Sequence, residues 1–266
     1  GQHTQRPLVS AYGRFVGRKG KVFGWLAVIA VLTIGAFYTV LTGWSVAYAY
    51  FSATGQITHD TAAFFASDFL HITGSITEFG KLSIAALLST LFVAALSWWV
   101  ISKNIQSGIE KWCSFFLPLL FVMVLLFCAV VIFLPGSFTG FMEYLRPDFS
   151  KLYSFSIWRD VFGQLFFSLS LGLGIVVGYS RHNQRKMNLR KAMFQVAMAD
   201  FLISFLAGFI IFGCIGYMAQ QSGIDFHQIA QSSSVFDIGY VIFPMILKTF
   251  GPILSSVIGA VFFFCL

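Results

Sequence analysis

Long apolar stretches alternate with short polar ones along most of the chain. A run of about 20 apolar residues is long enough to cross the hydrocarbon core of a bilayer as a helix. Counting apolar windows predicts five complete spans and a shorter sixth run, at residues 22–51, 82–102, 112–134, 157–180, 193–219 and 252–266. The pattern therefore predicts an all-α polytopic membrane protein, with one incomplete transmembrane domain over residues 1–266.

Composition narrows the class of protein. Of the 266 residues, 58% are hydrophobic and only 10% are charged, which is more apolar surface than a soluble domain can bury. The net charge is +7, but the basic residues cluster at the ends of the apolar runs, so we expect a lipid bilayer rather than nucleic acid as the partner. The four cysteines are widely separated and lack metal-ligand spacing.

The polar connections fall into two classes. Lysine and arginine concentrate in residues 1–21, 103–111 and 181–191, whereas the intervening connections carry most of the acidic residues. By the positive-inside rule the basic segments are cytoplasmic, so residue 1 is predicted to lie inside. The absence of an Asn-x-Ser/Thr acceptor favours a prokaryotic source, and hence a multi-pass protein of the plasma (bacterial inner) membrane.

The fourth span differs from the others. Its centre holds Ser168, Ser170, Gly172 and Gly174, residue types that weaken a helix. Hydrocarbon tolerates no unpaired peptide group, so a helix broken at this depth must face protein or a water-filled cavity. We expect a break near residues 168–172, where two half-helices direct their dipole ends at a small solute and a cation.

Asp200 is the only carboxylate deep inside a predicted span, since Asp160 lies at the start of the fourth. An acid at this depth is costly and must face the interior of the bundle. Two readings remain open: a structural acceptor that ties helices together, and a cation ligand or proton carrier. Ser204 shares the helix face of Asp200, and Gln164 shares that of Ser168. Serine and glycine in membrane helices also commonly form close-packing surfaces.

Several collinear motifs resemble one transporter family. They are Gly-Gln-Leu-Phe-Phe-Ser-Leu-Ser-Leu-Gly-Leu-Gly at 163–174, Gly-Ala-Phe-Tyr-Thr-Val-Leu-Thr-Gly-Trp at 35–44, and the segments 102–111 and 207–219. Together they resemble the neurotransmitter:sodium symporter family, in a bacterial-type member, from the end of its second helix to the start of its eighth. The resemblance implies part of an inverted-repeat (5+5) amino-acid transporter fold with an interrupted sixth helix.

The resemblance also implies site residues. A small amino-acid-like solute and Na+ would bind at mid-membrane, and Ser168 and Asp200 match the positions of sodium ligands. Gln164, Ser168 and Ser204 resemble the chloride-coordinating set. The side chains that match the solute pocket are Ile34, Tyr38, Phe167, Ser170 and Leu173.

One residue departs from the family pattern. Asp200 stands where an asparagine is usual, so its carboxylate can supply the negative charge that Cl− otherwise brings, and we hypothesise that chloride is not required.

The resemblance favours sodium-coupled symport by alternating access. The alternative is a non-transporting receptor or regulator that retains the pocket. The sequence does not favour a membrane-embedded enzyme, because all five histidines fall in connecting segments and not inside the spans. Neither the solute nor the oligomeric state follows from the sequence.

Overall fold

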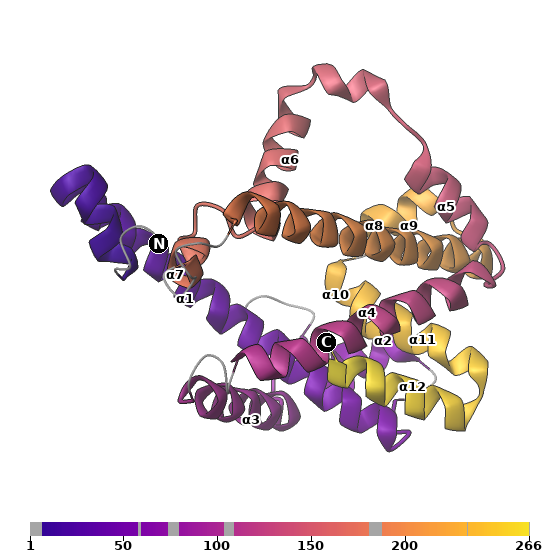
Figure 1. Cartoon of the computed structure of the whole chain (residues 1–266). Coiled ribbons are helices and arrows are strands. Elements are labelled where there is room, and N and C mark those ends of the chain that lie inside the picture. The colour runs from indigo at the N-terminus through magenta and orange to yellow at the C-terminus, as the bar shows by residue number, and fades with distance from the viewer. Residues whose placement is uncertain are drawn as a thin grey trace. The chain divides into compact units, whose positions relative to one another are not determined.

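The computed structural model describes residues 7–57, 60–73, 80–103, 109–180, 188–232 and 234–265, and throughout these ranges the regular elements are helices (Figure 1). The N-terminal half contains α1 (Leu8–Ala53), α2 (Thr61–Ala63), the π-helix η1 (Phe64–Phe69), α3 (Ile84–Ile101), α4 (Lys111–Ile132), α5 (Ser137–Leu145) and the 3₁₀ helix η3 (Phe149–Tyr153). The remainder contains α6 (Phe155–Ser168), α7 (Ile175–Ser180), α8 (Leu189–Ser222), α9 (Phe226–Ser232), α10 (Val235–Asp237), the π-helix η4 (Ile238–Ile242), α11 (Phe243–Leu247), the 3₁₀ helix η5 (Lys248–Phe250) and α12 (Pro252–Cys265).

Four of the described helices are long and apolar enough to cross a membrane: α1, α3, α4 and α8. The apolar helical segments Ile238–Leu247 and Pro252–Cys265 are shorter. The expected fourth span does not form one long helix, because α6 stops at Ser168 and α7 starts at Ile175. The architecture is therefore that of an all-α polytopic membrane protein with an interrupted helix, as the sequence predicts.

Helix ends follow ordinary capping chemistry. The Asp60 carboxylate accepts a hydrogen bond from the Ala63 amide at the start of α2, and the Ser83 hydroxyl accepts one from Ala86 at the start of α3. The expected first span begins at residue 22, whereas α1 begins at Leu8 and contains a non-helical Gly17 with φ 70° and ψ −149°. The basic N-terminal segment is thus helical up to a glycine that permits this kink.

The chain divides into two compact units. Unit 1 comprises residues 1–37 and 146–204, and unit 2 comprises residues 38–145 and 205–266. Unit 2 holds a core of aromatic side chains around the fully buried Tyr48, whose ring contacts Phe69, Tyr240 and Phe263 at centroid distances of 5.3, 5.0 and 5.2 Å. Edge-to-face pairs of this kind add to the free energy gained from burial.

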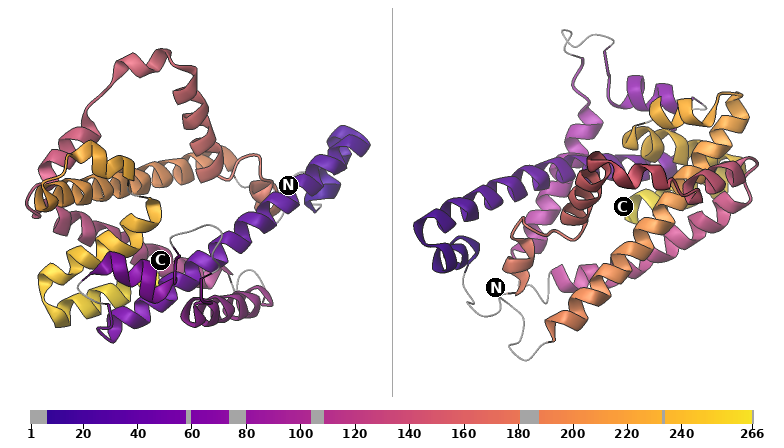
Figure 2. Two further views of the ribbon diagram at one scale, coloured as in Figure 1. Left: turned by 180° about the vertical axis from the view of Figure 1, so that it is seen from behind. Right: turned by 90° about the horizontal axis from the view of Figure 1, so that it is seen from above.

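Within unit 2, α5 packs on the second half of α8 through the stacked rings of Phe141 and Phe209, and α12 lies along α4 (Figure 2). Glycines allow the first of these contacts. A Cβ atom on Gly140 would overlap the Phe212 carbonyl oxygen, and one on Gly213 would overlap the Phe141 ring. Close helix packing through small residues is typical of membrane interiors.

Candidate functional site

The interruption between α6 and α7 lies within unit 1. Three of its residues have the left-handed backbone that a helix cannot contain: Ser170 with φ 53°, Gly172 with φ 81° and Gly174 with φ 79°. The sequence prediction placed the break near 168–172, and the observed irregular segment runs from Leu169 to Gly174. At two of these positions glycine adopts a positive φ without steric cost. Ser170 adopts a conformation that is uncommon for a residue with a Cβ atom.

The break leaves main-chain oxygens available. The last backbone hydrogen bonds of α6 end on the carbonyls of Leu165, Phe166 and Phe167, and helical bonding resumes where the Gly178 amide donates to Gly174. Within the described part of the chain, the carbonyls of residues 168–173 accept no backbone hydrogen bond. A group of unpaired carbonyl oxygens at a helix break is the kind of site that coordinates Na+ in transporters.

Ser168 and Asp200 meet at this break. The Ser168 hydroxyl, at the end of α6, donates a 2.6 Å hydrogen bond to Oδ1 of Asp200 in the middle of α8, and both residues are half-buried. The two residues lie 32 positions apart in the sequence, so the contact comes from the folding of unit 1. Since the serine donates to one carboxylate oxygen, the pair keeps oxygen lone pairs that can bind a cation.

The other residues expected around the break are more open. Gln164 and Phe167 on α6 and Ser204 on α8 are exposed, while Ser170 and Leu173 in the irregular segment are half-buried. Gly174 packs against the start of α1, where its Cβ position would lie 2.6 Å from Leu8 Cδ1. The loop that carries the carbonyls is thereby held against α1 within unit 1.

The two α1 residues expected at the solute pocket fall in different units. Ile34 is half-buried and belongs to unit 1, whereas Tyr38 is 47% exposed and belongs to unit 2. Tyr38 lines a mainly apolar cavity of ≈ 360 Å³ together with Thr42, Ser45 and Tyr240. The structure thus gives Tyr38 a cavity of a size suited to a small solute.

Sequence reasoning missed the hydrogen-bonded group around Tyr240. Its hydroxyl donates to the Leu41 carbonyl at 3.0 Å and lies 2.9 Å from the Ser45 hydroxyl, so the segment after α8 is fastened to α1. Residues 236–250 carry an amphipathic pattern, which predicts short helices but does not show where a single tyrosine points.

Carboxylates, imidazoles and thiols do not gather in threes to hold a metal anywhere in the described ranges. The oxygen-rich arrangement at the break, with one carboxylate, one hydroxyl and main-chain carbonyls, matches the preference of hard cations for oxygen ligands. Such an arrangement can bind a hard cation reversibly.

Comparison with known proteins identifies a family of similar sequences. The profile of the Sodium:neurotransmitter symporter family matches residues 53–266. An uncharacterised sodium-dependent transporter of Methanocaldococcus jannaschii is 35% identical over 243 residues, which are 91% of this chain and 49% of that protein.

Two animal proteins are similar over shorter stretches. The sodium-dependent dopamine transporter of Caenorhabditis elegans is 32% identical over 180 residues, 67% of this chain and 29% of its own length. The sodium- and chloride-dependent creatine transporter 1 of Oryctolagus cuniculus is 30% identical over 204 residues, 76% of this chain and 31% of its own. The chain spans about half the length, or less, of these curated relatives.

Proposed function

The chain belongs to the sodium:neurotransmitter symporter family, and from this premise we propose that the intact protein carries a small amino-acid-like solute across the plasma membrane together with Na+. Transport would proceed by alternating access around a fixed site at mid-membrane. The family is one of transporters, and four of the described helices are long and apolar enough to span a bilayer.

The observation that carries this proposal is the contact between Ser168 and Asp200 at the broken helix. A carboxylate in a membrane helix is retained where it meets a cation or a donor, and here it meets a hydroxyl beside unpaired carbonyls. We propose that these oxygens bind Na+. Sodium dependence in the names of the similar proteins supports this choice of ion over a proton.

The residues expected at the solute pocket are proposed on the sequence resemblance. We propose that Ile34, Phe167, Ser170 and Leu173, all in unit 1, contact the solute. Tyr38, in unit 2, is a further proposed solute contact. The names of two relatives specify dopamine and creatine, both small nitrogen-bearing solutes, which supports the chemical class without identifying the solute of this protein.

We further propose that Cl− is dispensable. Gln164, Ser168 and Ser204 would form the chloride-coordinating set, but Asp200 already brings one negative charge to the Ser168 hydroxyl. A single anion beside Na+ is enough to balance it. Uptake by the intact protein should be equal in chloride and in gluconate, and strict chloride dependence would refute this assignment.

The discriminating experiment measures solute-stimulated 22Na+ binding and uptake by the intact protein in proteoliposomes. Asp200→Ala and Ser168→Ala should each lose sodium coupling, because each removes an oxygen ligand. Asp160→Ala is the matched control, since Asp160 is an exposed carboxylate on α6 that pairs with Arg159. Normal sodium coupling in both site variants would overturn the site.

The same proteoliposomes distinguish a transporter from a non-transporting receptor. Counterflow of labelled solute requires the binding site to face both sides of the membrane in turn, whereas a receptor shows saturable binding without exchange. We expect exchange at a rate that rises with Na+ concentration. Saturable binding with no exchange would favour the non-transporting receptor or regulator.

A further inference from the structure

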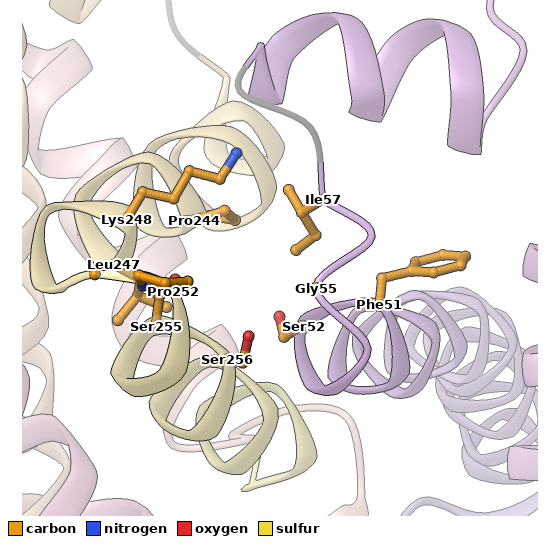
Figure 3. Close-up of a pocket in the computed structure, with 11 residues that line it drawn as sticks. Phe51, Ser52, Gly55, Ile57, Pro244, Leu247, Lys248, Pro252, Ser255 and Ser256 are labelled. Atoms are coloured by element: carbon orange, nitrogen blue, oxygen red, sulfur yellow. The ribbon is translucent and has the colours of Figure 1, made fainter.

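A pocket with a lysine and three serines in its wall lies in unit 2, separate from the broken helix. It has a volume of ≈ 400 Å³ and is enclosed by the end of α1, the short helices α11 and η5, and the first turn of α12 (Figure 3). One part of its wall is apolar, formed by Ile57, Pro244 and Leu247. The other part carries Lys248 and three serines, Ser52, Ser255 and Ser256.

The three pocket serines differ from two helical serines of unit 2 whose hydroxyls bond within their own helix. Ser89 and Ser222 donate to the carbonyl four residues earlier, at 2.8 and 2.7 Å, which satisfies their hydroxyls within their own helix. Ser52, Ser255 and Ser256 make no side-chain hydrogen bond to any residue that the structure describes. Ser52 is only 7% exposed, whereas Ser255 and Ser256 are half-buried, and Figure 3 shows Ser52 and Ser256 on two adjacent helices at the pocket. Hydroxyls that line a pocket in this way can bind a polar ligand.

Lys248 adds a positive charge to this pocket. Its side chain extends along the pocket toward Ile57 in Figure 3 and is partly buried. Burial lowers the pKa of the Lys248 ammonium, and the nearby Asp60 carboxylate raises it, with burial the larger effect. An anionic group bound in the pocket would offset part of the cost of burying the ammonium.

The start of α12 contributes in the same direction. Its first turn begins at Pro252, and the Ser255 amide donates to the Gly251 carbonyl at 3.0 Å. The positive end of the helix dipole thus lies at the pocket, where it favours a negative charge. The lysine, the three hydroxyls and the dipole all select an anion with several acceptor oxygens.

We propose that this pocket binds a small organic carboxylate. The carboxylate accepts hydrogen bonds from Lys248 and the serine hydroxyls, and the short hydrocarbon part packs on Pro244 and Leu247. The volume exceeds what a halide needs, and the apolar wall suits a ligand with a hydrocarbon part better than inorganic phosphate. The pocket joins segments predicted to be extracytoplasmic, so the ligand would arrive from outside. This proposal does not depend on sodium-coupled transport.

Calorimetric titration of butyrate into the intact protein, purified in a neutral detergent without Na+ or transported solute, tests this site. We expect saturable binding that weakens at least about tenfold in Lys248→Met and about fivefold in Ser256→Ala, as expected for one charged and one neutral hydrogen bond. Lys248→Arg should restore most of the affinity because it keeps the charge. Lys81→Met, which removes an exposed lysine before α3, should bind as the parent does.

Circular dichroism of each variant separates loss of the site from loss of the fold, and Ser256→Ala tests the pocket without removing its charge. Parent protein that shows no saturable binding would overturn the proposal, as would a folded Lys248→Met whose affinity stays within twofold of the parent. Inorganic phosphate or chloride that binds more tightly than butyrate would overturn the choice of a carboxylate. Displacement of butyrate by phosphatidylglycerol added to the micelles, at an equal concentration, would overturn the choice of a free acid.

Discussion

The two units of the protein differ in how they bury side chains. In the described ranges, Ala11 is the one hydrophobic side chain of unit 1 that is buried, whereas unit 2 buries Tyr48, Phe69, Ile246 and many others. The core of unit 2 is packed through aromatic contacts and through glycines at which helices approach closely. Unit 1 contains instead a helix broken at a segment with three residues of positive φ, beside a hydroxyl that is hydrogen-bonded to a carboxylate.

This difference separates the source of stability from the proposed site of ion binding. A packed aromatic core tolerates little rearrangement, because each contact depends on its neighbours. A segment with few buried contacts opens at low free-energy cost, and moving elements are drawn from such regions. Substitutions in unit 2 should therefore change stability, and substitutions in unit 1 should change ion binding and transport.

The largest expected loss of stability comes from replacing a glycine at a close helix contact in unit 2. Gly213→Val places a Cβ atom 2.5 Å from Val131 Cγ1 and against the Phe141 ring, where neither helix can move without opening the core. We expect a loss of about 3 kcal/mol, near the upper end for overpacking, and poor recovery of folded protein. Gly163→Val on α6 meets no atom within 4 Å and serves as the control. Thermal unfolding in detergent measures both, and equal midpoints would contradict the comparison.

The next effect concerns charge at the break in unit 1. Asp200→Asn keeps an oxygen acceptor for Ser168 but removes the negative charge, so Cl− should become necessary to balance Na+. We expect uptake in chloride to be partly retained and uptake in gluconate to fall about tenfold or more, with no change in the unfolding midpoint beyond a few degrees. The ratio of the two rates is the measurement. A ratio unchanged from the parent would show that the carboxylate does not replace chloride.

Sequence alone predicts much of this arrangement. The serines and glycines of 168–174 have weak helix propensity, so the break could be predicted from local chemistry. Asp200 stood out because a carboxylate in an apolar run is costly. The 2.6 Å hydrogen bond between Ser168 and Asp200 could not be predicted, because it depends on the tertiary packing that brings α8 to the end of α6.

The pocket proposed to bind a carboxylate was missed for a related reason. Ser52 and Ser256 come from segments about 200 residues apart, and only packing shows that they line one pocket. A weak signal was present in the lone Lys248 between two apolar helices, followed by Gly251 and Pro252. A lysine in that position is as consistent with an exposed turn, so sequence cannot decide its role.

A smaller effect should follow from straining the break without touching its ligands. Gly172 has φ 81° and no heavy atom nearer than 3.9 Å to its Cβ position, so Gly172→Val tests backbone conformation alone. A β-branched residue in this region costs about 1–2 kcal/mol, which should lower sodium affinity about tenfold by shifting the segment toward helix. Gly178→Val in α7, where space is open and the backbone is helical, is the matched control. Equal sodium affinities in the two variants would argue against a role for the left-handed turn.

The smallest effect distinguishes two tyrosines in the core of unit 2. Tyr240 bonds to Ser45 and to the Leu41 carbonyl, so Tyr240→Phe should lose about 1 kcal/mol and lower the unfolding midpoint by a few degrees. The Tyr48 hydroxyl is fully buried and has no hydrogen-bond partner among the described residues. Removing an unsatisfied hydroxyl relieves a desolvation cost, so Tyr48→Phe should leave the midpoint unchanged or raise it. If both variants lose stability equally, the Tyr48 hydroxyl stabilises the fold as much as that of Tyr240, and the predicted difference between the two tyrosines is wrong.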